Sequence, residues 1–317
     1  MSNPFVDQRD VVGGTAVVRV VAAVVSVTGA DRAAVLNATL SQSLVGLKSG
    51  DSREALELDG NGRIVRILHV LERDNDTLLI VPGATGTDVV SWLDKRVFLE
   101  DVTATDLSDS VAVYGGTVGF GDVVWSDPWP TIQPGGFTYG AETVPAWTYR
   151  EFVTPADAPA PARIVDESAL DALRAVAGRP GLAEVDELAL PHEFDWLRTA
   201  VHLSKGCYTG QETVAKIHNV GHPPRRLVRL HLDGSDSVFA EAGDPVLLDG
   251  EQVGFVTTAG NHFEDGPVAL ARVKRTVPVD AALVVDRDGH PLAANQEVIV
   301  PPTAGATAAE RLRPSRP

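Results

Sequence analysis

The chain has 317 residues, of which 27 are Lys or Arg and 43 are Asp or Glu, and its formal net charge of −16 disfavours direct binding to RNA or DNA phosphates. The length predicts two domains or three small ones, and a hydrophobic content of 44% is enough for a sizeable core. The single cysteine, Cys207, excludes an intrachain disulfide, and a zinc ribbon or a four-cysteine cluster cannot be built from this chain alone.

Neither an export signal nor a membrane-spanning segment is visible in the sequence. Residues Met1–Pro4 lack the basic region and apolar core of a signal peptide. The longest apolar run, Ala16–Val27, contains Arg19 and is too short to span a bilayer. Together with the lone cysteine, these features predict a cytoplasmic protein with no membrane partner.

The first half of the chain predicts helices mixed with antiparallel strands. Residues 1–10 are expected to form a loose arm, and the valine-rich run 16–27 a single buried strand. The further elements expected, in chain order, are a helix after Thr28–Asp31, strands at 55–58 and 64–70 around the hairpin turn Asp59–Gly62, a strand at 77–81 and a helix at 88–93. This order predicts an α+β sandwich with an antiparallel sheet.

The second half begins with an irregular stretch and ends with a pattern of short strands. Residues 115–148 are rich in Gly, Pro and Trp, and residues 155–161 resemble an exposed linker. A helix is expected at 168–177, where Gly178 and Pro180 stop it. After Arg225, short alternating strands are separated by turns such as Asp249–Gly250 and Asp288–Gly289, which predicts a small barrel.

These patterns give the domain boundaries that we expect. A first α+β domain covers residues 12–115, and a second covers 116–225, with segments that can interleave with the first. A C-terminal β-barrel covers residues 226–300. Residues 301–317 are rich in Pro, Ala and Thr and are expected to be a disordered tail.

The cysteine lies in the octapeptide Lys205–Glu212, whose sequence is Lys-Gly-Cys-Tyr-Thr-Gly-Gln-Glu. A free cysteine is either a small buried hydrophobe or a reactive group. Gly206 and Gly210 allow tight turns on both sides of it, and Thr209 and Glu212 have capping-box spacing before a helix that contains 213–217. Cys207 is therefore expected just before a helix N-terminus, where the helix dipole and Lys205 would favour the thiolate.

Other polar residues near the octapeptide have more than one interpretation. Glu212 either caps the helix or has a catalytic role. Five histidines lie within 40 residues of chain, but their spacing is not diagnostic of a metal site, and we expect none; they are His192, His202, His218, His222 and His231. The arginines at 225, 226 and 229 form a basic cluster that either binds an anion or pairs with the acidic surface.

The octapeptide resembles the signature of the YgfZ family, relatives of the glycine-cleavage T-protein (an aminomethyltransferase) that bind tetrahydrofolate and support iron–sulfur enzymes. Two further segments carry the resemblance, Val25–Asp31 and Leu58–Arg63. It implies a T-protein-like α+β fold over residues 16–300, in which two α+β domains and a C-terminal barrel surround a central channel that holds folate. We expect Cys207 at the mouth of this channel, partly exposed.

The resemblance also supplies candidate site residues. Cys207 and Lys205 are the candidate catalytic pair, and the other signature residues are Gly206, Tyr208, Thr209, Gly210, Gln211 and Glu212. Arg225 and Arg226 are candidates for pairing with the anionic tail of folate, and Trp196 either packs on the pterin ring or belongs to the core. In folate-binding relatives a Glu hydrogen-bonds the pterin, and its counterpart here is Val176, which predicts weak or no folate binding.

The favoured function is therefore a YgfZ-type factor that assists assembly or repair of iron–sulfur clusters in client enzymes, and through them affects tRNA modification. Cys207 would be its working thiol, in contact with a transient iron–sulfur cluster, sulfur or a redox partner. A folate-dependent one-carbon transferase and a non-catalytic folate-binding scaffold are the alternatives. Whether the protein is an enzyme stays open, although glycine-cleavage activity is not expected, because the segment that leads to the T-protein's catalytic aspartate is not recognisable around Pro82–Ala84.

Overall fold

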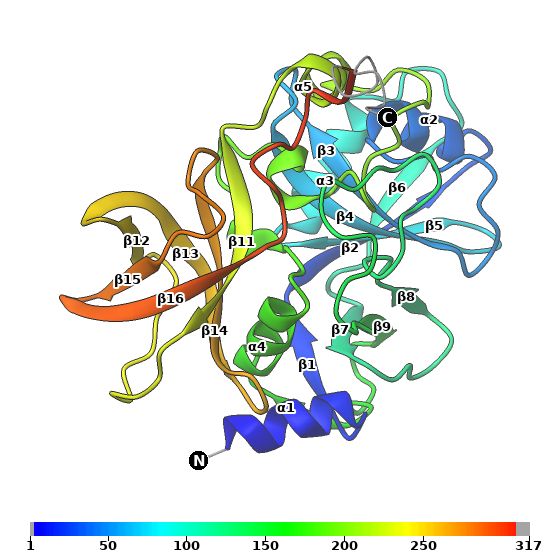
Figure 1. Ribbon diagram of the computed structural model, residues 1–317. Helices are drawn as coiled ribbons and strands as arrows, with labels where there is room; N and C mark the ends of the chain where they lie inside the picture. The colour runs from blue at the N-terminus through cyan, green and yellow to red at the C-terminus, as the bar shows by residue number, and fades with distance from the viewer. Residues whose placement is uncertain (1–2, 309–317) are drawn as a thin grey trace.

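The computed structural model describes residues 3–308 and has three parts, two five-stranded sheets and a closed barrel (Figure 1). The barrel lies on one side of the molecule, and the two sheets lie on the other, one above the other in the view of Figure 1. This arrangement confirms the predicted α+β fold with a C-terminal barrel.

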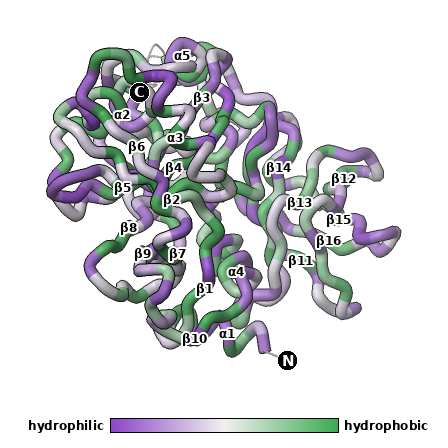
Figure 2. The backbone as a smooth tube through the Cα atoms, turned by 180° about the vertical axis from the view of Figure 1, so that it is seen from behind, coloured by the Kyte–Doolittle hydropathy of each residue, from purple (hydrophilic) through white to green (hydrophobic). Residues whose placement is uncertain are grey.

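The valine-rich run near the N-terminus forms two strands instead of the one that was predicted. β1 (Ala16–Val20) belongs to the first sheet, and β2 (Ala22–Thr28) belongs to the second. Val21, between them, is 79% exposed. Figure 2 shows this hydrophobic stretch running through the middle of the molecule, where it joins the two sheets.

The second sheet has the strand order β3-β4-β5-β2-β6, with β3 (Ser52–Leu58), β4 (Ile64–Glu72), β5 (Thr77–Pro82) and β6 (Thr103–Asp106). Helices α2 (Arg32–Thr39) and α3 (Gly86–Asp94) share a hydrophobic core with one face of it. The predicted hairpin turn is confirmed, because Asp59–Gly62 joins two paired antiparallel strands. Gly62 has a φ of 74°, a conformation that favours glycine.

The first sheet takes strands from distant parts of the chain. Its order is β10-β1-β7-β9-β8, with β7 (Val111–Gly116), β8 (Val124–Ser126), β9 (Arg150–Pro155) and β10 (Arg163–Val165). The whole second sheet is therefore inserted between β1 and β7. Residues on both sides of position 116 contribute to one sheet, so the segments interleave.

Helix α4 (Ser168–Val176) ends as the sequence predicts, at Ala177 and the positive-φ residue Gly178. Helix α1 (Pro4–Val12) corrects the expectation of a loose arm. Asn3 caps it by accepting a hydrogen bond from the Phe5 amide, and Val11 is fully buried. A helix this short depends on tertiary packing, so its sequence alone is hard to distinguish from that of a polar arm.

The barrel closes in the order β11-β14-β13-β12-β15-β16. Its strands are β11 (Arg225–Leu232), β12 (Pro245–Leu248), β13 (Glu251–His262), β14 (Gly266–Lys274), β15 (Leu283–Arg287) and β16 (His290–Val298). The two predicted Asp–Gly turns have positive φ at both residues, as tight hairpins require.

The last described residues of the chain are part of the folded structure. Residues 301–308 were expected in a disordered tail, but they pack against helix α5 (Gln211–Val220): Thr307 donates to the carbonyl of His218, and Ala306 donates to that of Ile217. Residues 309–317 lie outside the described part of the chain. Within residues 3–308, the helices are all too short or too polar to cross a bilayer.

Candidate functional site

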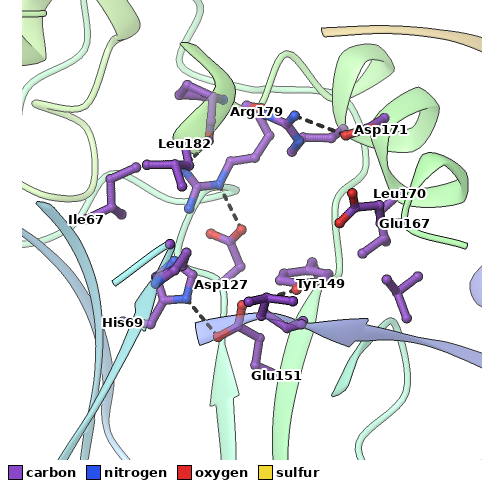
Figure 3. A pocket seen from close by; sticks show the side chains of 18 of the residues that line it. Ile67, His69, Asp127, Tyr149, Glu151, Glu167, Leu170, Asp171, Arg179 and Leu182 are labelled. Atoms are coloured by element: carbon purple, nitrogen blue, oxygen red, sulfur yellow. Dashed lines mark hydrogen bonds and ion pairs between the residues drawn. The ribbon is translucent and has the colours of Figure 1, made fainter. Parts of the chain in front are cut away.

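A cavity of about 370 Å³ lies between the two sheets and α4 (Figure 3). Its volume is within the range of small-molecule sites. The junction of β1 and β2, strand β4, the aromatic residues Trp147 and Tyr149, and the segment 179–182 all contribute to its walls. Most of this lining is apolar, and the charged groups gather on two opposite sides.

One side is a single face of α4. Glu167, Leu170, Asp171 and Arg174 line the cavity at the spacing i, i+3, i+4 and i+7, which places them on one helical stripe. Arg174 donates to Glu184 at 2.6 Å and to the Thr258 hydroxyl at 2.8 Å. Burial raises the pKa of Asp171, although Arg174 opposes this effect, and its side chain remains 39% exposed.

The same helical geometry removes Val176 from the cavity. Val176 is two residues beyond Arg174, about 200° around the helix, and its side chain packs against the hydrophobic core that includes Ile299. Its carbonyl accepts a hydrogen bond from Arg229. A glutamate at position 176 would not point into this cavity, so the expectation of weak folate binding loses its structural basis.

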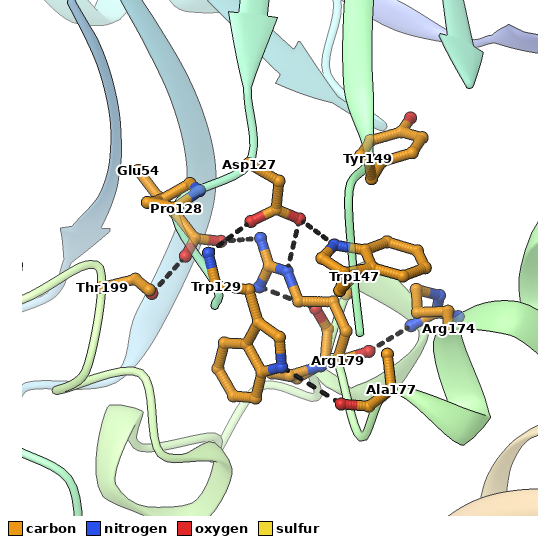
Figure 4. Close-up of polar contacts among 12 residues, drawn as sticks. Glu54, Asp127, Pro128, Trp129, Trp147, Tyr149, Arg174, Ala177, Arg179 and Thr199 are labelled. Carbon is orange, nitrogen blue, oxygen red and sulfur yellow. Dashed lines mark hydrogen bonds and ion pairs between the residues drawn. The ribbon is translucent and has the colours of Figure 1, made fainter. Parts of the chain in front are cut away.

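A buried arginine in the lining of the cavity connects segments of the two sheets through its hydrogen bonds (Figure 4). Arg179 donates to Asp127 at 2.8 Å and to Glu54 at 2.7 Å, and its third nitrogen donates to the Pro180 carbonyl at 3.0 Å. Asp127 also accepts from the Trp147 indole at 2.7 Å. The two buried carboxylates and the guanidinium therefore neutralise one another and satisfy one another's hydrogen bonds, which connects the segments that line the cavity.

The other charged side is built on β4 and β9. His69 Nδ1 lies 2.7 Å from Glu151 Oε2, and the imidazole stacks on Trp125 with ring centroids 3.9 Å apart. Glu151 also accepts from the Tyr149 hydroxyl at 3.1 Å. Burial lowers the pKa of His69, but Glu151 more than compensates, so its pKa is raised above 6.5.

The octapeptide forms an exposed turn before α5. Cys207 is exposed and the helix begins at Gln211, so both expectations are confirmed. The predicted capping box is wrong: the N-cap is Gly210, in the left-handed conformation, and no side chain among residues 3–308 caps the helix. Glu212 is exposed in the first turn of α5, where its negative charge interacts favourably with the positive end of the helix dipole.

Cys207 does not line the cavity. Helix α5, which follows it, lies at the top of the molecule in Figures 1 and 2, whereas α4 lies in the lower half. The predicted position at the channel mouth is therefore wrong. The octapeptide packs instead on the hairpin between β3 and β4, where Gly210 approaches the carbonyl oxygen of Asp59.

The side chain of Lys205 is hydrogen-bonded to backbone carbonyls. Its ammonium donates to the carbonyls of Asn37, Leu40 and Gln42, at the end of α2, and lies 5.0 Å from the centre of the Tyr208 ring. Burial lowers its pKa to about 8. All three N–H donors are used, so Lys205 anchors the octapeptide to the C-terminal end of α2 and the residues that follow it.

Gly210 and Gln211 complete this attachment. Gly210 has a φ of 82°, and a Cβ there would lie 2.6 Å from the carbonyl oxygen of Asp59. Gln211 donates to the Lys205 carbonyl at 3.3 Å, while Thr209 is exposed and Tyr208 is buried. A Cβ added at Gly206 would meet no atom of the described part of the chain within 4 Å.

The three candidate folate-binding residues also lie outside the lining of the cavity. Trp196 is buried in the core and donates to Glu54 at 3.1 Å. Arg225 pairs with Asp186 at 2.8 Å and Glu193 at 3.0 Å. Arg226 is buried in the barrel strand β11 and donates to the Val277 carbonyl at 2.9 Å.

The histidines are dispersed over several elements. His192 donates to the Val214 carbonyl at 3.1 Å, and burial lowers its pKa to about 3. His218 lies 2.8 Å from the Tyr139 hydroxyl, and His222 contacts the Ala304 carbonyl at 2.7 Å. Within residues 3–308, no three His, Cys, Asp or Glu side chains form a group that could hold a metal ion.

Comparison with known proteins agrees with this architecture. Residues 225–303 match the glycine cleavage T-protein C-terminal barrel domain. The glycine cleavage aminomethyltransferase T of Bartonella henselae superposes with a TM-score of 0.69 over 95% of this chain and 90% of that protein, at 17% identity. This chain has the T-protein fold.

Two relatives of known sequence are transferases by name. A chloroplastic protein of Arabidopsis thaliana named as a transferase is 25% identical over 79% of this chain, which spans 63% of that relative's length. The aminomethyltransferase of Streptomyces avermitilis is 26% identical over 84% of this chain and 80% of its own length. These similarities extend well beyond the barrel.

The T-protein fold thus presents a central cavity whose polar residues sequence reasoning missed, namely His69, Glu151, Arg179 and Asp171. Only weak signals could have found them. His69 is a polar residue inside the apolar strand β4, and Arg179 directly follows the glycine that stops α4.

Proposed function

We propose that the cavity binds a reduced folate and that the protein is a YgfZ-type factor which assists assembly or repair of iron–sulfur clusters. Its transient partners would be iron–sulfur enzymes, including those of tRNA modification, in the cytoplasm. Cys207 would be the working thiol. The observation that carries this proposal is the exposed position of the sole cysteine on a turn that is anchored by Lys205 and lies apart from the cavity.

Tetrahydrofolate suits the residues of the cavity. A pterin ring is planar, and the apolar and aromatic lining offers it Leu170, Tyr149 and Trp147. Its ring N–H groups need acceptors, and Asp171 and Glu167 present carboxylates from α4. The aminomethyltransferase relative is consistent with this choice of ligand, since the resemblance to T-proteins implies folate in the central channel of the fold.

An iron–sulfur cluster would be a substrate of this protein and not its resident cofactor. One thiol can supply only one of the four ligands that such a cluster needs, so a resident cluster does not fit this chain. An exposed thiol can instead contact a cluster or a sulfur atom in a partner protein, since the thiolate is the form that binds metal.

Complementation tests the role of Cys207. Cells that lack the protein receive the wild type, Cys207→Ser, or the control Ser204→Ala from the same exposed turn. We expect Cys207→Ser to leave iron–sulfur enzyme activities low while the control restores them. Full restoration by Cys207→Ser would refute the working thiol and favour a folate-binding scaffold.

A folate-dependent one-carbon transferase is the second candidate. The His69–Glu151 pair in the cavity favours it, because such a pair can transfer a proton to or from a substrate, and both relatives are named as transferases. A transferase assay with tetrahydrofolate and a one-carbon donor tests it. Turnover that is lost in His69→Gln would establish this function, and no turnover would exclude it.

A further inference from the structure

The two ring nitrogens of His69, Nδ1 and Nε2, have different surroundings. Nδ1 is held by Glu151, and the stack on Trp125 fixes the plane of the ring. Trp125 is itself fixed, because its indole donates to the Arg53 carbonyl at 2.8 Å. Nε2 has no hydrogen-bond partner within residues 3–308 and is not fully buried, so it is accessible from the cavity.

Two of the three arginines that line the cavity already have hydrogen-bond partners, and the third, Arg19 on β1, lies with its guanidinium 5.1 Å from the centre of the Tyr114 ring. Arg179 directs its nitrogens to Asp127, Glu54 and the Pro180 carbonyl. Arg174 donates to Glu184, Asp171 and Thr258. A ligand that offers a hydrogen-bond acceptor to β4 and β9 therefore meets His69, whereas one that offers it to β1 meets Arg19.

We infer that His69, backed by Glu151, is the proton-bearing donor that receives an acceptor atom of the ligand in the central cavity. The ligand class is a planar heteroaromatic ring with a carbonyl oxygen or ring nitrogen towards β4 and N–H groups towards α4. Figure 3 shows this opposition, with His69 and Glu151 facing Glu167 and Asp171 across the cavity. The inference rests on the proposed function and adds a specific contact to it.

The charges around His69 support this role. Burial and Arg179 oppose the protonated ring, but Glu151 on β9 and Glu54 on β3 outweigh them, so the pKa of His69 is raised. Asp127 also lines the cavity, and Tyr149 stays neutral because burial and Glu151 raise its pKa well above 10. The two carboxylates thus favour the ring that carries a proton on both nitrogens.

The test is calorimetric titration of the full chain with tetrahydrofolate between pH 6 and 9. If the protonated ring binds, affinity is highest at low pH and falls up to tenfold per pH unit above the pKa of His69. His69→Gln should bind more weakly at pH 6 and lose this dependence. Glu151→Gln should move the fall to lower pH, a shift that loss of structure alone would not produce.

His290→Gln, an exposed barrel variant, is the matched control and should behave as the wild type. Melting curves establish that each variant is folded. The inference is overturned if the wild type binds with an affinity that is independent of pH, or if His69→Gln keeps the wild-type profile. No binding by the wild type at any pH overturns the folate assignment itself, together with this contact.

Discussion

Gly210 is the residue on which the attachment of the octapeptide depends. Any side chain there must adopt a left-handed conformation, and its Cβ would approach the backbone oxygen of Asp59 to 2.6 Å. We expect Gly210→Ala to lower the free energy of unfolding by about 1–2 kcal/mol or more, since backbone strain and a backbone clash add together. Urea unfolding measures the change.

Gly206→Ala is the matched control in the same octapeptide, because open space surrounds its Cβ position and its φ is not in the left-handed region. It should change stability little. If the two alanine variants were equally stable, the octapeptide turn would have shifted to accommodate the new methyl group, and the close contact of Gly210 with the Asp59–Gly62 hairpin would not be needed for stability.

Arg179 is the second position at which one residue determines much of the local stability. Its replacement by Met leaves the buried carboxylates of Glu54 and Asp127 without their cation. Breaking such a buried pair costs about 3–5 kcal/mol, so urea unfolding should show a large loss. Arg163→Met, which removes a half-exposed arginine from its pairs with Asp7 and Asp10, should have little effect. A similar small effect of Arg179→Met would mean that water reaches the two carboxylates.

At the scale of elements, the position of α4 depends on its close contact with the barrel. A Cβ at Gly260 on β13 would lie 2.8 Å from the Cβ of Ala172, so only glycine permits this approach. We expect Gly260→Val to push α4 away from β13 and weaken tetrahydrofolate binding at least tenfold, because α4 carries one side of the cavity.

The control for this element is Gly60→Val, at a hairpin position where a Cβ meets no neighbour. It should leave binding unchanged. Calorimetric titration of both variants decides the matter, and unchanged binding by Gly260→Val would show that the cavity tolerates a displaced α4.

Several elements could be predicted because their signals are local. The turn Asp59–Gly62 and the helix stop at Gly178 contain residues that suit these conformations by themselves. The break at Val21 could not be predicted, because no Gly or Pro marks it and both halves are equally rich in valine. The pairing of β1 with β7 and of β2 with β5 divides this run, and that pairing is a tertiary effect.

At the scale of the molecule, the octapeptide and two short segments were enough to indicate the T-protein fold. They did not indicate the polar residues of the cavity. His69 and Glu151 are 82 positions apart, and Glu54 and Arg179 are 125 apart, so only the interleaved sheets bring them together. For the same reason, the sequence alone could not show that Val176 points away from the cavity.

For the whole molecule, the proposed function depends on the binding of tetrahydrofolate in the central cavity. Titration calorimetry would compare the wild type with Leu170→Trp, which fills the cavity, and with Leu99→Trp, whose side chain is fully exposed. We expect saturable one-to-one binding by the wild type and Leu99→Trp, and none by Leu170→Trp. Absence of binding by the wild type, or equal binding by all three proteins, would contradict it.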